Sequence, residues 1–377
     1  IGLIVTPQQA AASRAAIRAG KAPRAQDLTL HFDPQAGHGP AAIEDFARLA
    51  AIHAGKTTLE IAVACERPLE AELTDLAAMM RDAGLKPDAV IVSPSVDRQS
   101  TPPGSTWPDC PPLEELYAAA RSAFPSLRLG GGMLSYFTEL NRKRVPPGQL
   151  DFITHATNPI VHAADDASVM QTLEALPFIT RSVRSIYADK PYRIGPSTIA
   201  MRQNPYGSRT MDNPAGRRLP MTHADPRHNG LFAAAFALGY AARVVDAGLD
   251  LLTLSALTGP LGLFAGASEP GAPGKPRALF HVVEALAGLA GSEWIECRSS
   301  DPASVLALAV RRAPRHRAWL IANITPVAQR IAFADETPEN FEIFDDRLAF
   351  RQQAGRPLLL PPFAVAWSGL SAWSNLA

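Results

Sequence analysis

The chain of 377 residues carries 36 Lys and Arg residues and 36 Asp and Glu residues, so its formal net charge is zero. It contains no basic run with interleaved aromatic residues, which argues against a nucleic-acid partner. It also contains no apolar segment of about 18 residues or more, so we expect no membrane span.

Short β-rich apolar runs alternate along the chain with longer segments of helical periodicity. In chain order they give eight strand-then-helix units before the pattern changes near residue 291. The expected strands are residues 1–5, 27–33, 58–65, 88–93, 127–134, 152–157, 192–196 and 251–257. The helices that follow them are expected at residues 8–19, 41–54, 69–83, 113–123, 136–143, 167–188, 230–247 and 276–290.

Strands that alternate with helices pair in parallel through right-handed crossovers. Eight such units over roughly 250 residues or more have the size of a closed (β/α)8 barrel, the TIM barrel. An open, doubly wound parallel sheet is the alternative, although no dinucleotide-binding glycine signature follows the first strand. The sequence therefore predicts an α/β fold with a TIM-barrel domain at residues 1–290.

After residue 290 the helical segments give way to short strands separated by turns. This change predicts a small antiparallel β domain at residues 291–377, with a structural role. Its expected strands are residues 319–324, 329–333, 341–344, 348–351 and 358–367.

The cysteines and the start of the chain indicate the cellular compartment in which we expect the protein. Cys65, Cys110 and Cys297 are widely spaced and odd in number, which fits a reducing compartment without a disulfide framework or a zinc knuckle. The chain opens on Ile1 inside an expected strand, without a visible signal peptide. We therefore expect a cytoplasmic protein whose chain is a piece of a longer one or has lost its start.

Candidate site residues follow from the position of catalytic groups in TIM barrels, at the carboxyl ends of the strands. Polar residues crowd the sixth strand end in LDFITHATNPIVHAADDAS, residues 150–168. We expect the polar side chains of these strand ends to converge on one cavity. The candidates are His31, Tyr136, Glu139, Asn141, His155, Asn158, His162, Arg202, Asn204 and Thr258.

Each leading candidate also has a structural interpretation. Glu139 follows a glycine-rich strand end and two aromatic residues, which would desolvate a catalytic carboxylate, but it could equally be an ordinary first-turn Glu. His31 could be a structural histidine, and Asn158 precedes a proline, as in many turns. Asp165 and Asp166 are expected to cap the next helix rather than to catalyse.

The chain lacks the usual sequence patterns of metal sites and of a nucleophilic serine. Neither H-x-H nor H-E-x-x-H occurs in the chain, and the spacing of His155 and His162 is not that of metal ligands. No G-x-S-x-G is present either. We therefore expect no metal and no cofactor.

Four stretches together resemble the D-apionate lactonase family: GGGMLSYFTELNR, DFITHATNPIVHAADDASVMQTLEA, IGPSTIAMRQNPYG and ADPRHNGLFAAAFALG. Their order and spacing match as well as their letters, from Ile1 to near Ala290. The resemblance implies a central TIM barrel and a small C-terminal β domain. It also implies an N-terminal β domain, which is absent from this chain.

The resemblance further implies hydrolysis of a sugar-acid lactone, D-apionolactone, to D-apionate. The positions that match the family motifs are Glu139, Asn158, His162, Arg202 and Asn204. After the eighth strand the family pattern reads E-T-T-G-W, whereas this chain has A-L-T-G-P at residues 256–260. An acidic and an aromatic side chain are therefore missing from that strand end.

Three functions remain open from the sequence. In a lactonase, Glu139 would activate water, His155 or His162 would supply a proton, and Arg202 with Asn158 would stabilise the oxyanion and the sugar. A glycosidase would need a second carboxyl group beside Glu139. A sugar-binding barrel without catalysis would agree with Ala256. All three predict a small carbohydrate-derived partner.

Overall fold

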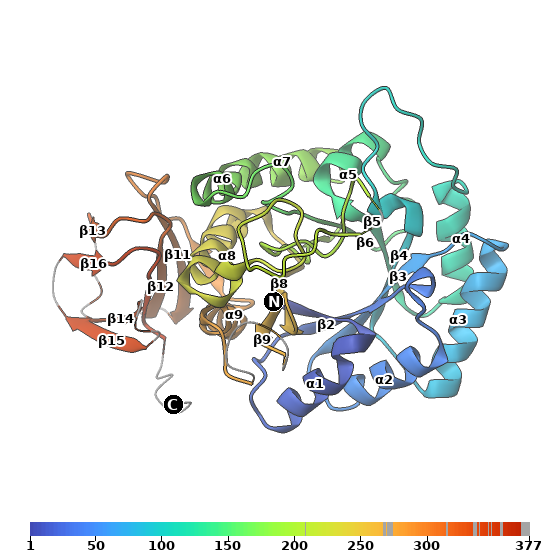
Figure 1. Cartoon of the computed structure of the whole chain (residues 1–377), viewed down its shortest axis with the longest axis horizontal. Coiled ribbons are helices and arrows are strands. Elements are labelled where there is room, and N and C mark those ends of the chain that lie inside the picture. Colours follow the sequence, from blue (N-terminus) through green and yellow to red (C-terminus); the bar gives the residue numbers. More distant parts are fainter. Residues whose placement is uncertain are drawn as a thin grey trace.

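The computed structural model describes residues 1–207, 209–266, 269, 274–313, 316–334, 338, 340–345, 347, 349–354 and 357–370. Its parallel strands follow one another in the order β1 to β8, and β1 pairs with β8, so the barrel is closed (Figure 1). The predicted TIM barrel is confirmed, and the open sheet is excluded. The strands are β1 (Gly2–Val5), β2 (Asp27–Phe32), β3 (Lys56–Val63), β4 (Ala89–Pro94), β5 (Arg128–Tyr136), β6 (Phe152–Ala156), β7 (Tyr192–Ile194) and β8 (Leu251–Thr258).

Helices surround this barrel. They are α1 (Pro7–Arg18), α2 (Pro40–Ala50), α3 (Leu69–Ala83), α4 (Leu113–Ala123), α5 (Phe137–Lys143), α6 (Asp166–Gln171), α7 (Leu176–Ile186), α8 (Leu231–Val244) and α9 (Ala278–Leu289). Short 3-10 helices are η1 (Pro34–Ala36), η2 (Ser95–Arg98), η3 (Thr172–Ala175), η4 (Pro226–Asn229) and η5 (Val245–Ala247). The single helix expected at residues 167–188 is instead α6, η3 and α7. Pro177 in the first turn of α7 explains the break, because proline has no backbone N–H for a continuous helix.

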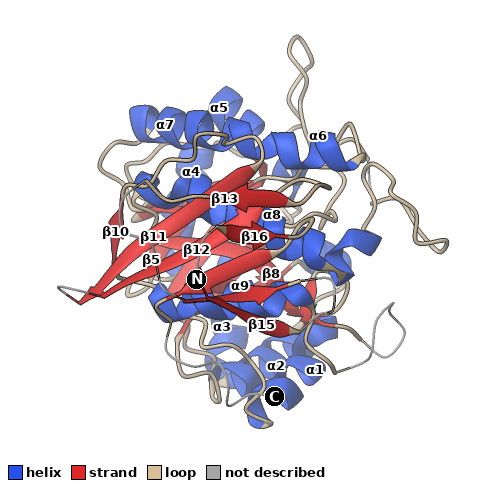
Figure 2. Cartoon of the chain, turned by 90° about the vertical axis from the view of Figure 1, so that its left-hand side faces the viewer, coloured by secondary structure: helices blue, strands red, loops and turns tan. Residues whose placement is uncertain are grey.

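The C-terminal part is an antiparallel β domain, as predicted (Figure 2). Its larger sheet has the order β10-β11-β12-β17-β14-β15, and β13 pairs with β16. The strands are β10 (Glu293–Ile295), β11 (Val305–Ala313), β12 (His316–Asn323), β13 (Gln329–Ile331), β14 (Asn340–Phe344), β15 (Phe350–Ala354), β16 (Leu358–Leu360) and β17 (Val365–Ser368). In the barrel part, the short β9 (Gly262–Phe264) adds to β8.

Some strand predictions in this domain were wrong. β10 and β11 were missed, and the expected strand at residues 358–367 is two strands that join different sheets, with Pro361 and Pro362 between them. Proline cannot donate to a strand ladder, which accounts for the interruption. The strand expected at residues 348–351 begins at Phe350, and Leu348 lies outside the described residues.

The β domain packs on the barrel through α8. A side chain at Gly239 of α8 would meet Leu306 of β11 and Ile324 after β12. The described part of the chain contains no helix that is long and apolar enough to cross a membrane.

A contact across the barrel interior shows which side chains of β3, β6 and β7 point inward. Arg193 of β7 donates to Thr58 Oγ1 of β3 at 3.2 Å, and its guanidinium lies 3.9 Å from the ring centroid of Phe152 on β6. Because β3 and β7 are not neighbours in the sheet, these three side chains point into the barrel. Side chains alternate along a strand, so every second residue from each of them also points inward, and the others pack against the helices.

A long connection after β7 crosses the carboxyl ends of the strands. It comprises residues 195–207 and 209–225, and it reaches β3 and β5 from the far side of the barrel. Asn158, just after β6, donates from its side-chain amide to three successive carbonyl groups of this connection, those of residues 198–200. The connection is therefore a fixed cover over part of the barrel mouth.

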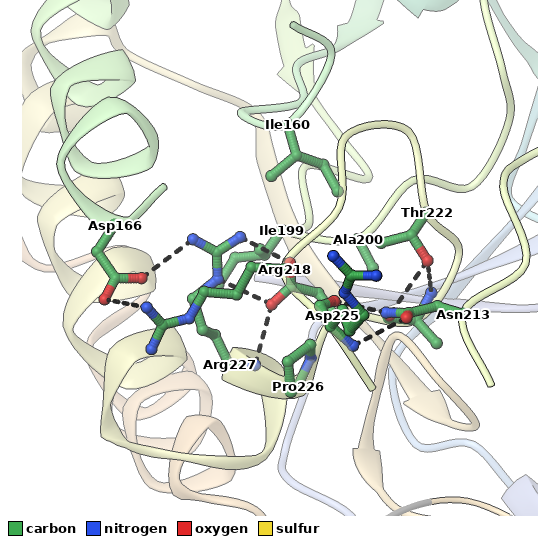
Figure 3. A network of polar contacts seen from close by, with 12 residues as sticks. Ile160, Asp166, Ile199, Ala200, Asn213, Arg218, Thr222, Asp225, Pro226 and Arg227 are labelled. Carbon is green, nitrogen blue, oxygen red and sulfur yellow. Dashed lines mark hydrogen bonds and ion pairs between the residues drawn. The ribbon is translucent and has the colours of Figure 1, made fainter. Parts of the chain in front are cut away.

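The end of this connection is held by ion pairs at the start of α6 (Figure 3). The Asp166 carboxylate pairs with Arg218 at 3.1 Å and with Arg227 at 3.2 Å, and Arg227 also pairs with Asp225 at 2.7 Å. Asp165 caps α6 through the backbone N–H of Ser168, as expected. Asp166 therefore fastens the connection to α6 rather than capping the helix through its side chain.

Substitution of Gly132 in β5 tests the close approach of β5 and β6. Its φ of +147° is rarely adopted by other residues, and a Cβ there would overlap the carbonyl oxygen of Thr154. We expect Gly132→Ala to lower the free energy of unfolding by about 2–4 kcal/mol in urea denaturation. Gly148→Ala is the control, because nothing lies within 4 Å of its Cβ position. Equal stabilities of the two variants would contradict the close approach of β5 and β6 at Gly132.

Removal of the Asp166 carboxylate tests the anchor of the connection. Asp166→Ala takes one of two carboxylate partners from Arg227, whose side chain is only 4% exposed. We expect a loss of about 0.5–2 kcal/mol in the free energy of unfolding, measured by urea denaturation. Asp212→Ala is the control. It removes an ion pair between Asp212, 65% exposed, and Arg209, 78% exposed, so the free energy of unfolding should change by less than about 0.5 kcal/mol.

Candidate functional site

A cavity of about 560 Å³ opens beside the barrel mouth, between α5, the loop after β6, α7 and α8. Four predicted site residues line it: Tyr136, Glu139, Asn158 and His162. The rest of the wall is mainly apolar, with Phe137, Val161, Leu176, Ile179, Phe236 and Tyr240 among its members. A mainly apolar pocket with a few polar groups is typical of small-molecule sites.

Glu139 is the carboxylate of this cavity. It lies in the first turn of α5 and is 2% exposed, so its charge is largely removed from water. The Ser100 hydroxyl donates to its Oε1 at 2.5 Å, and Arg142, one turn later, donates to the same oxygen at 3.2 Å. Arg142 also donates to the carbonyl of Thr101, so the loop after β4 and α5 together fix the carboxylate.

Tyr136 and His162 lie on the same cavity wall. Burial raises the pKa of Tyr136, the charge of Glu139 raises it further, and the charge of Arg202 opposes this effect. The phenol therefore stays neutral and can donate a hydrogen bond near Glu139. His162 is exposed, and its ring centroid lies 5.9 Å from that of Tyr206 on the connection after β7.

The expectation that His155 faces the cavity is wrong. On β6, Phe152 points into the barrel and Ile153 packs in the helix-facing core, so alternation places His155 on the helix side. Its ring is fully buried, with Nε2 bonded to the Tyr192 hydroxyl at 2.7 Å and Nδ1 to the Ala156 carbonyl at 2.8 Å. Burial lowers the pKa of His155 to about 4, so it is a neutral structural histidine.

The predicted asparagines have structural hydrogen bonds. Asn158 lines the cavity, but its NH₂ group holds residues 198–200 and its oxygen accepts from the N–H of Ile160. Asn204 closes a turn by accepting from the N–H of Tyr206 and donating to the carbonyl of Arg209. Asn141 is exposed on α5 and does not line the cavity. The polar atoms of Asn158 and Asn204 are therefore committed to the backbone.

Thr258 also lies away from the cavity. Its hydroxyl is 3.1 Å from the Ser13 hydroxyl, so it faces α1 rather than the barrel mouth. Arg227 and His228 likewise do not reach the cavity. Arg227 is paired with two carboxylates, and the His228 ring is buried with Nε2 at 2.9 Å from the Gly262 carbonyl.

A second polar cluster occupies the centre of the barrel mouth, and we call it the central cluster. It consists of His31 on β2, Glu60 on β3 and Arg202 on the connection after β7. Glu60 Oε1 lies 2.7 Å from His31 Nδ1 and is also paired with Arg202, which donates to the Leu134 carbonyl as well. Burial opposes the charge of Glu60, but Arg202 and His31 outweigh it and lower the pKa of Glu60 to about 2.

Arg202 therefore does not line the cavity with Glu139, contrary to expectation, because it is bound to Glu60. Glu60 itself was missed. The signal was present in TLEIAVAC, where one carboxylate interrupts an otherwise apolar strand. An ionisable residue in the middle of a buried strand needs a counter-charge, which makes it a candidate for a site.

The described residues contain no group of three or more His, Cys, Asp or Glu side chains arranged to hold a metal ion. The polar side chains that line the cavity can take part in hydrogen bonding and proton transfer. A carboxylate, a neutral phenol and an exposed imidazole surround one cavity. This arrangement suits general acid–base catalysis on a small polar molecule.

Two family models and a curated protein are similar to this chain. Family models match residues 1–291 (D-apionate lactonase, TIM barrel domain) and residues 302–368 (D-apionate lactonase, C-terminal immunoglobulin-like domain). A D-apionate lactonase from Brucella anthropi is 62% identical over 334 residues, which are 89% of this chain and 54% of that protein. The chain thus spans about half the length of this curated relative.

Solved structures share the fold at low identity. A family 39 glycoside hydrolase from Bacteroides cellulosilyticus WH2 has a TM-score of 0.60 and 11% identity, with 97% of this chain and 79% of that chain covered. The catalytic domain of a family 30 xylanase C from Talaromyces cellulolyticus has a TM-score of 0.57 and 12% identity, with 97% and 95% covered. These similarities concern the fold alone, whereas the family models and the curated relative show that the chain belongs to the D-apionate lactonase family.

Proposed function

We propose that this protein hydrolyses a sugar-acid lactone, with D-apionolactone as the substrate and D-apionate as the product. The observation that carries the proposal is the buried carboxylate of Glu139 in the wall of a 560 Å³ cavity at the barrel mouth. The family and the name of the Brucella anthropi relative supply the substrate. We assign the chemistry to the barrel, residues 1–290, and a structural role to residues 291–377.

The proposed mechanism needs one base, one acid and a donor for the oxyanion. Glu139 takes a proton from water while the water oxygen bonds to the lactone carbonyl carbon. The carbonyl oxygen then carries the negative charge, and the neutral Tyr136 phenol donates to it. When the bond from the carbonyl carbon to the ring oxygen breaks, His162 donates a proton to the departing alkoxide. The proton that Glu139 took from water then passes to His162 and restores both groups.

Two observations support Glu139 over Glu60 as the base. Glu139 lines the cavity, whereas Glu60 does not. In addition, Arg202 and His31 lower the pKa of Glu60 to about 2, which makes its carboxylate a weak base. Ser100 and Arg142 both donate to Oε1 of Glu139. Within the described part of the chain, no side chain donates to Oε2 of Glu139. A carboxylate oxygen without a protein donor is available to a water molecule.

Replacement of Glu139 tests the role of the base. Glu139→Gln keeps the size of the side chain but cannot accept a proton, so we expect kcat for D-apionolactone to fall by about 10²-fold to 10⁴-fold. Acid release from the lactone measures kcat, and circular dichroism measures folding. Glu114→Gln, on the exposed first turn of α4, is the matched control and should keep full activity. Full activity of Glu139→Gln would show that another group activates the water.

Chelation tests the proposed independence from metal ions. The proposed steps use only a carboxylate, a phenol and an imidazole, so kcat should stay within about twofold after exhaustive dialysis against EDTA. The same acid-release assay measures it. Loss of turnover that zinc or manganese restores would overturn this mechanism.

A further inference from the structure

His31 has a hydrogen-bonding atom directed at the barrel mouth that the proposed mechanism does not use. The residue lies near the carboxyl end of β2, on the inward side of the strand with Thr29 and Asp27. Its side chain is 12% exposed, and Nδ1 lies 2.7 Å from Glu60 Oε1. The other ring nitrogen, Nε2, is the atom of interest.

The contact with Glu60 fixes which nitrogen of neutral His31 carries the proton. Glu60 is ionised, and an ionised carboxylate can only accept hydrogen bonds. The short contact therefore requires a proton on Nδ1, so Nε2 of the neutral ring has a lone pair and acts as an acceptor. The pairing of Glu60 with Arg202 holds this carboxylate in place across the barrel.

No donor to Nε2 is found within the described part of the chain. The nearest ring, His38, makes an edge contact with centroids 6.3 Å apart, and its own Nδ1 accepts from the backbone N–H of Asp33. An acceptor at the mouth of a barrel that no described protein group satisfies is free for a hydrogen-bond donor from water or substrate.

Two buried hydroxyl groups that also point into the barrel are unsatisfied. Ser93 of β4 lies two residues after Ile91, which packs with Phe152 inside the barrel, so Ser93 also points inward. Ser255 of β8 follows the same alternation, because Leu254 faces the helices. Among the described residues, neither hydroxyl has a hydrogen-bond partner, so the interior of the barrel contains polar groups that the protein itself does not satisfy.

The central cluster adjoins the cavity that contains Glu139. Tyr136 lines that cavity, and Arg202 of the cluster donates to the carbonyl of Leu134, two residues earlier on β5. Arg202 is bound to Glu60, which in turn holds His31. A lactone beside Tyr136 therefore lies close to the central cluster as well as to Glu139.

We infer that His31 accepts a hydrogen bond from a hydroxyl group of the lactone through Nε2, and that Glu60 is the positioning residue that sets this polarity. His31 thereby selects lactones that carry a hydroxyl at one position over lactones that lack it. This inference rests on the proposed lactone hydrolysis and names a specificity determinant for it.

The test compares D-apionolactone with two analogues that each lack one ring hydroxyl, at C2 or at C3. A site that binds a substrate hydroxyl rejects the analogue without it, so we expect wild-type kcat/KM to fall by about 10²-fold or more for one analogue. His31→Asn can still donate to Glu60 but lacks the Nε2 acceptor. It should lose a similar factor with D-apionolactone and less than about threefold with that analogue, so the preference disappears.

A purely structural role for His31 would lower kcat/KM for all three lactones by the same factor, and that outcome would overturn the inference. His53→Ala is the control, since this half-buried histidine lies beside Lys56 at the amino-terminal end of the strands. It should keep the wild-type preference. A preference that persists in His31→Asn would also overturn the inference.

A measurement without turnover separates this inference from the proposed function. ¹⁵N NMR should show a proton on Nδ1 of His31 and none on Nε2. Glu60→Ala removes the acceptor of the Nδ1 proton and should abolish this fixed tautomer. If no lactone is hydrolysed but the tautomer is found, the proposed function has failed. A proton on Nε2 of the wild-type protein would overturn the role of His31 as an acceptor.

Discussion

The ion pair between Glu60 and Arg202 is the contact on which the barrel mouth depends. It joins β3 to the connection after β7, from opposite sides of the barrel. Next to Arg202, Gln203 donates to the Leu134 carbonyl on β5, and the Pro205 carbonyl accepts from the N–H of Ser100. Ser100 in turn donates to Glu139. A buried carboxylate without its cation costs several kcal/mol, so this pairing fixes the connection and, through it, the carboxylate of Glu139 that we propose as the base.

The alternation of strands and helices was sufficient to predict the barrel, because a period of two and a period of 3.6 are local properties of the chain. It was not sufficient to predict which side of a strand faces inward. His155 shows the difference: its strand was predicted, but only the position of Phe152 inside the barrel reveals that His155 faces the helices. A shift of one residue exchanges the two faces, and the sequence of a strand that is buried on both faces does not distinguish them.

The two asparagines make hydrogen bonds that the sequence alone does not reveal. Asn158 and Asn204 stand where substrate contacts are expected, yet their amides satisfy carbonyl and N–H groups of an irregular connection. A buried connection has no ladder for its backbone groups, so side-chain amides must pair with them. Glu60 is the opposite case, a site candidate that the sequence analysis missed. Its place in the central cluster depends on Arg202, which lies 142 positions away in the sequence. Long-range pairing of this kind leaves no local pattern.

The surroundings of Ala256 explain why the eighth strand end can lack an acidic residue. Ala256 is 1% exposed on β8, and its backbone pairs with Ile4 of β1 and Gly262 of β9. A carboxylate at this position would need a cation or donors to offset its desolvation. In this chain other carboxylates carry negative charge near the strand ends, among them Glu60 of β3 and Glu139 of α5, and each of these two has an arginine partner. The absence of an acid at residue 256 therefore does not remove the carboxylate that the proposed hydrolysis needs, which weakens the case for a barrel that only binds sugar.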